Sequence, residues 1–465
     1  MSGQKQGPSG RPPRRKLSAM GASLLKGGFP SEMNMFETNI TGVLFFDKAP
    51  EVDVIAKAFE KHLWPCERFS CCVEDGCWVN RHSEMDRSYH FQQQDVTSEA
   101  EIEALAMNVQ LTPLDRSYPL WRIWVLNNQG WTGMSAVIMN VHHCVGDGIG
   151  MLFAMSPLIG VKGGDAMSMV PLPRKVLPPA MRKKMPNATK KPTEPKKSCF
   201  AGFKLFFKGC FVSLLSKHDA ELTINPPLAK RTPFLPFSGK RVYTRLTSIP
   251  MSSIQAVRAR HGCSMNDVVM AALAGALRRY AIEVREDTCL KAAKKPIECN
   301  TLVMIGLPRK FDSEHAVDAL QNKMLFASAR LPVDKPTPRE RMESTLAAYS
   351  DLKCEAYMTG LVCFTTFLTA IAPSSVLAKA AGETWSKHTL CVTNVPSTTV
   401  EMTWPADGGQ PVRAINAVIA NVMPQVSLLS YNGRVYASLV ADPALFPEPE
   451  KLSAFWEAEF DALAE

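Results

Sequence analysis

The sequence predicts a mixed α/β protein organised in two halves. Strand-like runs, in which apolar and polar residues alternate, take turns with helix-like runs whose apolar residues recur every three to four positions. This pattern extends from Asn34 to about residue 160 and starts again near Lys240. The chain of 465 residues is also longer than the roughly 100–200 residues that one domain usually holds. We therefore expect two α/β halves with a connecting segment between them.

Changes of composition mark the boundaries of these halves. Residues 1–30 contain basic residues, prolines, serines and glycines but no acidic residue, and we expect a disordered basic tail. An organelle transit peptide is the alternative for this tail, because that class is also poor in acidic residues. The first half covers residues 31–165 and the second covers residues 226–465. Residues 166–225 combine a basic, proline-rich linker with a phenylalanine-rich segment.

The elements of the first half follow from their patterns. The segment 51–63 has Val52, Ile55 and Phe59 near one helical face. The helix over 97–111 begins with Thr-Ser and acidic residues, which stabilise a helix start. The polar stretch Asn-Asn-Gln-Gly separates the two strands of a hairpin. The expected strands are 39–47, 68–73, 121–126 and 131–143, and a further helix is expected over 148–158.

The second half shows the same alternation. Its longest helix is expected over 264–280, where Val269, Leu273 and Leu277 belong to one apolar face. The pair Asn432-Gly433 supplies the positive φ that a tight hairpin turn needs. The expected strands are 240–249, 301–308, 388–396, 425–433 and 434–442, and an amphipathic helix is expected over 450–465.

Two apolar segments resemble membrane segments without reaching the length of one. Residues 199–217 are rich in phenylalanine but contain Lys204 and Lys208, and residues 360–377 contain Pro373 and several threonines. Neither provides the run of about 18 or more apolar residues that crosses a bilayer, so we predict no transmembrane helix. For residues 199–217 a core helix and a helix at a membrane interface are both compatible with the pattern. No compact apolar stretch follows the basic N-terminus as in a secretory signal peptide.

Charge and cysteine content limit the classes of partner. The formal net charge is +9, and a basic stretch runs over residues 174–197 with one acidic residue, Glu194. No aromatic residues interleave with its lysines as a stacking surface for nucleic acid requires. We expect no nucleic-acid partner, and a solvated linker or a membrane surface are the alternatives. The thirteen cysteines show no zinc-like spacing, so we predict no metal site and a reduced, intracellular protein.

Two adjacent histidines end an apolar run in the stretch SAVIMNVHHCVGDGIG, residues 135–150. Side chains alternate across a strand, so His142 and His143 point to opposite faces if the strand continues through both. Asp147 either caps the helix that follows or pairs with a buried arginine. The glycines on both sides of it permit tight or left-handed backbone. A rigid turn after a strand end suits a general base held in a cleft.

These residues resemble a known family. The motif H-H-x-x-x-D-G, at residues 142–148, is the signature of CoA-dependent acyltransferases and peptide-condensation domains. From about residue 34 to the C-terminus the chain resembles one branch, the bifunctional wax ester synthases/diacylglycerol acyltransferases. Ser397 and Thr393 differ from the Gly and Ser that are usual in that branch. The segments that carry the resemblance, besides the motif, are PLDRSYPLW (113–121), SMNDVVMAALAGALRRY (264–280), CVTNVPS (391–397) and LSYNGRVYASLVAD (429–442).

The resemblance implies a fold and a catalytic group. The two halves would be chloramphenicol-acetyltransferase-like mixed-sheet units that form a tunnel between them, with the motif at its midpoint. His143 would be the general base and His142 its support. Asp147 would brace the turn, with Arg309 as its expected partner, and Gly148 completes the motif.

The resemblance also implies the reaction. A fatty acyl group would pass from acyl-CoA, acting as co-substrate, to a long-chain fatty alcohol or to diacylglycerol, with no cofactor. The residues implied in substrate binding are Trp121, Asn266, Asp267 and Asn394. Trp121 also fits a plain core aromatic, and the asparagines also fit turns or caps.

The expected substrates also indicate a location for the protein. Acyl donor and acceptor both partition into membranes, so a basic, phenylalanine-rich chain fits a peripheral enzyme on the endoplasmic reticulum or a lipid-droplet surface.

A peptide-condensation domain shares the motif, but should be joined to carrier or adenylation domains. An acyltransferase for soluble alcohols or phenols poorly matches the Asn-Asp and Asn-Val-Pro segments. An inactive lipid-binding scaffold has no reason to keep a base in a cleft.

Overall fold

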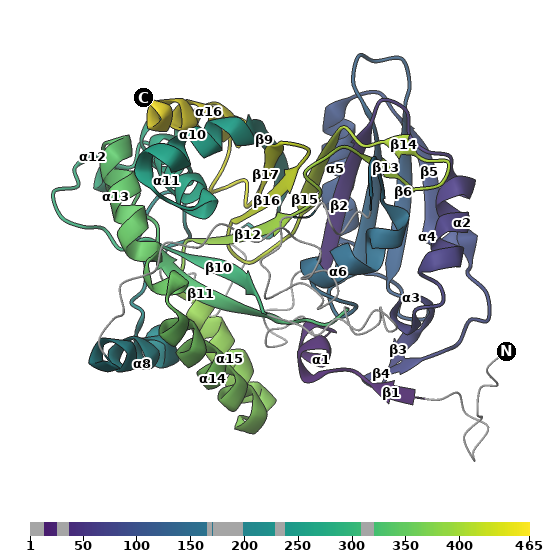
Figure 1. Cartoon of the computed structure of the whole chain (residues 1–465), viewed down its shortest axis with the longest axis horizontal. Coiled ribbons are helices and arrows are strands. Elements are labelled where there is room, and N and C mark those ends of the chain that lie inside the picture. The colour runs from purple at the N-terminus through teal and green to yellow at the C-terminus, as the bar shows by residue number, and fades with distance from the viewer. Residues whose placement is uncertain (1–13, 26–36, 165–169, 171–198, 228–237, 308–319) are drawn as a thin grey trace.

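The computed structural model describes residues 14–25, 37–164, 170, 199–227, 238–307 and 320–465. They form two lobes side by side, each built on a large β-sheet with helices packed against it (Figure 1). Both large sheets contain parallel and antiparallel neighbours. The predicted mixed α/β class with two halves is therefore confirmed. The tunnel between the halves stays a prediction.

The first lobe contains a five-stranded sheet in the order β15-β2-β7-β6-β5. β7 (Ser135–His142) lies at its centre, antiparallel to β2 (Asn39–Phe46) and β6 (Trp121–Asn128). β5 (Phe91–Val96) pairs in parallel with β6 at one edge. Seven of the eight residues of β7 are buried, as its apolar sequence requires. The strand that ends in the histidines is thus a central, enclosed strand.

Helices cover this first sheet. α2 (Val52–His62) buries Ile55 and Phe59, as its spacing predicts. α5 (Glu99–Leu111) starts at Ser98, whose hydroxyl accepts a hydrogen bond from the Glu101 amide at 3.3 Å. The short helices and strands of this lobe are α3 (Glu67–Ser70), β3 (Cys72–Glu74), β4 (Cys77–Val79), α4 (Arg87–His90), α6 (Gly148–Met155), a 3₁₀ turn (Ser156–Leu158) and β8 (Gly160–Val161).

One predicted element of the first lobe is wrong in part. A strand was expected over residues 68–73, but a turn of helix occupies Glu67–Ser70 and the strand begins only at Cys72. Arg68 and Phe69 are consecutive and both buried.

The second lobe contains a six-stranded sheet in the order β11-β10-β12-β16-β17-β9. The central strands β10, β12 and β16 run parallel to one another. The predicted hairpin turn lies between β16 and β17, with positive φ at Asn432 (44°) and Gly433 (71°). The strands are β9 (Val242–Pro250), β10 (Asn300–Gly306), β11 (Met324–Arg330), β12 (Leu390–Pro396), β16 (Gln425–Tyr431) and β17 (Arg434–Ala441).

Four helices pack on one another and against this second sheet, around α11 (Met265–Arg279) (Figure 1). All residues of α11 from Asp267 to Leu277 are buried, which confirms the apolar helix predicted there. The others are α10 (Met251–His261), α13 (Pro338–Tyr349) and α16 (Lys451–Ala464); a π-helical turn (Tyr280–Val284), α12 (Thr288–Lys291) and a 3₁₀ turn (Asp351–Lys353) follow α11 and α13.

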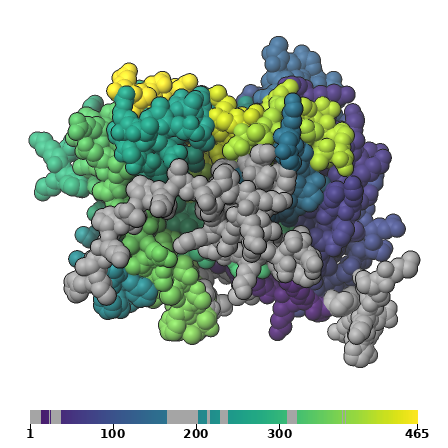
Figure 2. Space-filling model, viewed as in Figure 1, coloured from purple at the N-terminus to yellow at the C-terminus, as the bar shows by residue number. Residues whose placement is uncertain are grey.

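Part of the second half of the sequence joins the first lobe. β15 (Ala414–Val418) pairs with β2, placing Ile415 opposite Leu44. β13 (Met402–Trp404) pairs with β8 and with β14 (Gln410–Pro411). In Figures 1 and 2 these strands lie in yellow-green on the purple and blue lobe. These strands of the predicted second half, 226–465, thus pair within the first lobe, because strand partners are set by long-range pairing that no local pattern reports.

The predicted tail is also wrong in part. Residues 14–25 form β1 (Arg14–Lys16), which pairs with β4, and α1 (Ala19–Leu25). A Cβ atom added at Gly21 of α1 would lie 3.6 Å from the carbonyl oxygen of Cys144, in the histidine turn. The remaining residues of the predicted tail lie outside the described residues, as does most of the predicted basic linker.

The two apolar segments that fall short of membrane spans lie against each other in the structure. α8 (Cys199–Leu215) crosses α14 (Glu355–Ile371), which is followed by α15 (Ser374–Ser386). Glycines face each other at the crossing: a Cβ at Gly209 would meet the Tyr357 carbonyl oxygen at 2.1 Å, and one at Gly360 would meet the Phe206 carbonyl oxygen at 2.1 Å. Both glycines are therefore required for this close approach of the two backbones.

Candidate active site

The histidine pair lies where β7 ends and turns into α6. His142 is the last residue of the strand and pairs with Asn39 of β2. His143 stands one residue beyond, and its amide donates to the Thr38 carbonyl oxygen at 2.7 Å. The amide of Val145 donates back to the His142 carbonyl oxygen at 3.0 Å, which closes the turn. The turn is thus held by backbone hydrogen bonds on both sides of His143.

The His143 ring is buried and is held from the other lobe. Its Nδ1 lies 2.8 Å from Oδ1 of Asn322, a residue just before β11. The side-chain amide of the same asparagine donates to the His143 carbonyl oxygen at 2.8 Å. Burial lowers the pKa of His143 below its ordinary value of 6.5, because the charged imidazolium loses hydration. His143 is therefore neutral at pH 7, the state that a general base needs.

His142 has different partners. Its Nδ1 accepts a hydrogen bond from the Cys144 amide at 3.1 Å. Its Nε2 lies 3.3 Å from the Thr38 hydroxyl and 3.5 Å from a carboxylate oxygen of Glu37. The hydrogen bond to His142 lowers the pKa of Glu37, so this carboxyl is ionised at neutral pH. The two rings thus have separate surroundings. The strand ends at His142, so the condition under which alternation would separate the rings is not met.

Asp147 caps the helix that follows the turn and also contacts the second lobe. One carboxylate oxygen accepts from the Gly150 amide at 2.8 Å, and the other accepts from the Lys323 amide at 2.8 Å. The helix cap was one of the two roles predicted for it, and it is confirmed. Arg309, the partner expected in the other role, lies outside the described residues.

The glycines beside Asp147 make room for the second lobe. A Cβ at Gly146 would lie 3.1 Å from Leu320, and one at Gly148 would lie 3.3 Å from Val395. Neither glycine has a positive φ. The left-handed backbone that was one of the predicted reasons for glycine is therefore not used here, and the glycines allow a close approach of Leu320 and Val395 instead. The motif turn is packed directly against the second lobe on this side.

Arg68 is a residue of the site that sequence patterns do not reveal. Its buried guanidinium donates to the carbonyl oxygens of Cys144 (3.2 Å) and Val145 (2.9 Å), inside the motif turn. It also lies over the Trp78 ring at 5.4 Å from the ring centroid. Arg68 and Asn322 could not be singled out beforehand, because each is a lone polar residue without a spacing relation to the motif.

The predicted substrate-binding residues lie in two places, with Trp121 in the first lobe and the other three in the second. Trp121 is fully buried, stacks on His90 with centroids 3.9 Å apart, and donates to the Phe69 carbonyl oxygen at 2.9 Å. This is the core-aromatic alternative. Asp267 is also fully buried; it forms a capping box with Ser264 and accepts from the Lys353 ammonium at 2.5 Å.

The two motif asparagines, by contrast, are brought together. The side-chain amide of Asn394 in β12 donates to Oδ1 of Asn266 at the start of α11, at 2.7 Å. The next residue, Val395, is the one that approaches Gly148. The Asn-Asp helix and the Asn-Val-Pro strand therefore meet each other, and the strand meets the motif turn. Direct contact of either asparagine with substrate stays a prediction.

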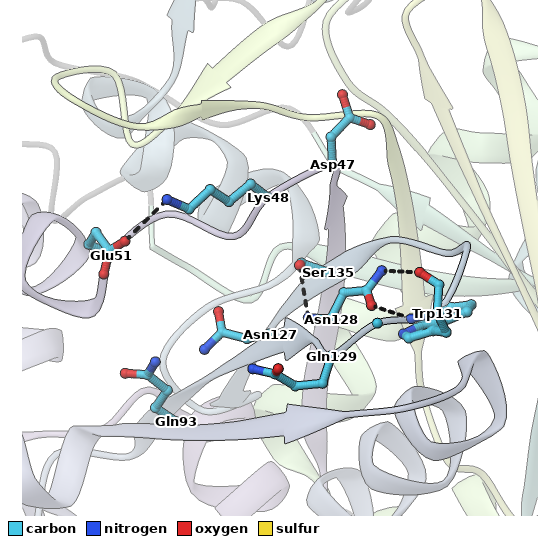
Figure 3. Close-up of a pocket in the computed structure, with 10 residues that line it drawn as sticks. Asp47, Lys48, Glu51, Gln93, Asn127, Asn128, Gln129, Trp131 and Ser135 are labelled. Carbon is cyan, nitrogen blue, oxygen red and sulfur yellow. Dashed lines mark hydrogen bonds and ion pairs between the residues drawn. The ribbon is translucent and has the colours of Figure 1, made fainter.

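A polar hollow of about 530 Å³ opens on the first lobe, and Figure 3 shows the residues that line it. It includes Ser135 at the start of β7, whereas His143 follows the end of that strand. The strand therefore separates the hollow from His143 by roughly 20 Å. None of the predicted site residues lines it; its lining residues are Asp47, Lys48, Glu51, Gln93, Asn127, Asn128, Gln129, Gly130, Trp131 and Ser135.

The described part of the chain has neither a membrane-spanning helix nor a metal-binding cluster. None of its helices is both long and apolar enough to cross a bilayer. No group of three or more His, Cys, Asp or Glu side chains in that part is arranged to hold a metal ion. The cysteines whose side chains are described are free thiols.

Among the solved structures that share this fold are enzymes of two classes that also carry the resemblance seen in the sequence. A wax ester synthase/diacylglycerol acyltransferase from Marinobacter aquaeolei VT8 matches with a TM-score of 0.58 at 17% identity, over 92% of this chain and 94% of that one. The first condensation domain of the CDA synthetase matches with a TM-score of 0.55 at 13% identity, over 97% of both chains. At these identities the likeness shows the fold, and it does not separate the two classes.

Sequence comparison separates them. A protein of Mycobacterium tuberculosis, provisionally named a diacylglycerol O-acyltransferase, is 23% identical over 378 residues, covering 75% of this chain and 70% of its own. Wax ester synthase/diacylglycerol acyltransferase 1 of Arabidopsis thaliana is 25% identical over 205 residues, 42% of this chain and 39% of its own. The family model of the wax ester synthase/diacylglycerol acyltransferase catalytic domain matches residues 70–269, and that of the C-terminal domain matches residues 320–464. The chain belongs to the wax ester synthase/diacylglycerol acyltransferase family.

Proposed function

We propose that this protein transfers a fatty acyl group from acyl-CoA to the hydroxyl of a long-chain fatty alcohol or of diacylglycerol. Family membership supports the reaction class, and one observation of the site supports the mechanism. The His143 ring is buried, has a lowered pKa, and is engaged at Nδ1, which leaves Nε2 as the nitrogen that can accept a proton. Acyl-CoA acts as co-substrate, and the reaction needs no cofactor.

The proposed step balances with these groups alone. Nε2 of His143 takes the hydroxyl proton while the alcohol oxygen attacks the thioester carbonyl carbon. The tetrahedral intermediate then collapses, the carbon–sulfur bond breaks, and the imidazolium returns its proton to the CoA thiolate. No acyl-enzyme forms. General base catalysis of this kind contributes about 10²–10⁴-fold to the rate, and the alignment of both substrates supplies the rest.

We also propose that the protein is peripheral on the membrane of the endoplasmic reticulum or on a lipid droplet. Six large apolar side chains are exposed in the described part of the chain, and all lie on α8, α14 and α15, the protruding group at the lower left of Figure 1. We call this surface the α8–α14–α15 face; its apolar residues are Phe203, Phe207, Phe211, Phe367, Ile371 and Val376.

The composition of this face fits a lipid surface. Phe203, Phe207 and Phe211 recur every four residues and form one ridge along α8. The exposed Lys204 and Lys208 lie beside it on the same helix. Aromatic residues flanked by lysines are typical of helices that lie in a membrane interface. The face therefore supports the interfacial alternative for this segment.

The reaction is tested with purified protein, palmitoyl-CoA and either hexadecanol or diacylglycerol. We expect wax ester or triacylglycerol, detected by thin-layer chromatography with a labelled acyl group. Formation of neither ester would reject the proposal. Acyl transfer to the amino group of an aminoacyl thioester would favour a peptide-condensation enzyme. Transfer to soluble alcohols or phenols would favour an acyltransferase for those substrates. Transfer to no acceptor at all would favour an inactive lipid-binding scaffold.

The assignment of the base is tested separately with His143→Ala. We expect a loss of about 10²–10⁴-fold in kcat. His261→Ala is the matched control, because His261 ends α10 in the second lobe, away from the motif turn. Full activity of His143→Ala would show that another group takes the proton, even if the ester products are formed.

A further inference from the structure

Asn322 contacts His143 through both ends of its side-chain amide. Its Oδ1 lies 2.8 Å from Nδ1 of the ring, and its Nδ2 donates to the His143 carbonyl oxygen at 2.8 Å. The two residues are 179 positions apart in the chain. One belongs to the turn after β7 in the first lobe, and the other precedes β11 in the second. The contact therefore joins the two lobes at the histidine.

These two hydrogen bonds determine which ring nitrogen carries the proton. A carbonyl oxygen can only accept, so the Nδ2 end of the asparagine must face it. The Oδ1 end then faces the ring, and it can also only accept. Nδ1 of His143 must therefore be the protonated nitrogen, and the lone pair of the neutral ring is on Nε2.

His142 shows the opposite arrangement. Its Nδ1 accepts from the Cys144 amide at 3.1 Å, so that nitrogen is unprotonated. The proton is then on Nε2, which faces the Thr38 hydroxyl and the Glu37 carboxylate. Neighbouring histidines are thus held in opposite tautomers by partners of opposite type. Of these two neighbouring rings, that of His143 is the one whose second nitrogen has no assigned partner among the described residues and carries a lone pair.

We propose that Asn322 is a positioning residue that holds the His143 ring in the Nδ1–H tautomer and so makes Nε2 the base. This rests on the proposed role of His143. Because the two residues come from different lobes, the His143 ring is held in this tautomer only when the two lobes are in contact. The residue that hydrogen-bonds to one ring nitrogen of a histidine commonly sets the orientation of the ring and the reactivity of its other nitrogen. An amide does so without the charge that a carboxylate in this place would add.

The first test is a pair of substitutions at Asn322. In Asn322→Ala the tautomer is no longer selected, and we expect kcat to fall about 10- to 100-fold with little change in KM. In Asn322→Asp an acceptor oxygen remains but a negative charge is added, so more activity is kept than in Asn322→Ala. The charge stabilises the imidazolium, and the acidic limb of the pH–rate profile moves to higher pH. The other ionisable groups near the ring, Asp147 and His142, are unchanged in both variants.

A matched control separates positioning from stability. Asn225 is a buried asparagine of the second lobe that also uses both ends of its amide, with the Leu222 amide and the Ala220 carbonyl as partners. Asn225→Ala should lose stability without a shift of the pH–rate profile. An unchanged profile in Asn322→Asp, or an effect no different from that of Asn225→Ala, would overturn the proposal.

Two further measurements keep the result independent of folding and of the proposed function. In the His143→Ala background Asn322→Ala should cause no further loss of kcat, whereas additive losses would contradict a role through the ring. In the wild-type protein with ¹⁵N-labelled histidine, the His143 resonances should show a protonated Nδ1 and an unprotonated Nε2. The opposite tautomer would overturn the proposal, even if His143→Ala had already confirmed the base.

Discussion

One carboxylate oxygen of Asp147 accepts a hydrogen bond at 2.8 Å from the backbone amide of Lys323 in the other lobe. The second oxygen accepts one from the Gly150 amide at 2.8 Å and so caps α6. One side chain therefore fixes the turn within the first lobe and attaches it to the second. The segment of Asn322 and Lys323 contacts the motif twice, once at His143 and once at Asp147. The motif aspartate is therefore a structural link between the two lobes.

Removal of this link should lower both the stability of the protein and its activity. Asp147→Ala removes a helix cap, about 0.5–2 kcal/mol, and leaves the amide of Lys323 without an acceptor, about 1–3 kcal/mol. We expect the free energy of unfolding in urea to fall by about 2–4 kcal/mol and kcat to fall with it. Asp147→Asn keeps one good acceptor and should lose less of both. An alanine variant as stable as the wild type would contradict the linking role.

The expected partner of Asp147 at Arg309 has its own test. If the two side chains pair, the single variants Asp147→Asn and Arg309→Gln should each lose stability, and the double variant should lose less than the sum. The coupling free energy from this double-mutant cycle should be about 1 kcal/mol or more, because a buried charge left without its partner is unfavourable. Additive losses would exclude the pairing.

The pH dependence of the reaction follows from the burial of His143. A base works when it is unprotonated, so activity is present above its pKa and is lost as the pH falls through it. Burial lowers this pKa below 6.5. The acidic limb of kcat/KM against pH should therefore lie below pH 6.5, with a slope of about one proton. A limb clearly above pH 6.5 would mean that another group controls the reaction.

Stability should also depend on pH, through a histidine outside the site. Burial lowers the pKa of His90 to about 4, whereas the unfolded chain has the ordinary value of 6.5. The unfolded state binds a proton first as the pH falls, so stability decreases below pH 6.5 and the loss is complete near pH 4. At about pH 5 this amounts to about 2 kcal/mol.

His90→Phe is the variant that isolates this group. Phenylalanine keeps the packing on Trp121 and removes a ring nitrogen, Nε2, that is buried without a hydrogen-bond partner among the described residues. The free energy of unfolding in urea should be measured at about pH 7.5 and about pH 5. Its decrease between the two pH values should be smaller by about 2 kcal/mol in the variant than in the wild type. Equal losses in the two proteins would reject the assignment.

Membrane binding should depend on the α8–α14–α15 face. Substitution of Phe203 and Phe207 by serine removes two exposed aromatic side chains from its ridge, each worth about 1.5–3 kcal/mol when fully buried in lipid. The fraction that floats with phosphatidylcholine/phosphatidylserine vesicles should fall at least about tenfold. Lys204→Ser should weaken binding only to vesicles that contain phosphatidylserine. Lys61→Ser, on α2 of the other lobe, is the charge-matched control, and unchanged flotation of the double serine variant would exclude this face.

Local patterns made several elements predictable from the sequence alone. α11, the Asn432-Gly433 hairpin and the cap at Asp147 were all recognisable beforehand. In each case the residues that interact are within a few positions of one another. Their spacing is therefore set by the helix or turn that they form, and the sequence displays it directly.

The sequence by itself determined the fold class, the motif turn and the family, because the motif residues and their spacing are written in one continuous stretch or in short segments. Only the tertiary structure decided which residues surround the base: Asn322, Arg68 and the approach of Val395 to Gly148. The same holds for β15, which joins the first sheet although it comes late in the chain. These contacts connect residues tens to hundreds of positions apart, and no local periodicity encodes such a partner; chain reversal and sheet pairing bring the pairs together.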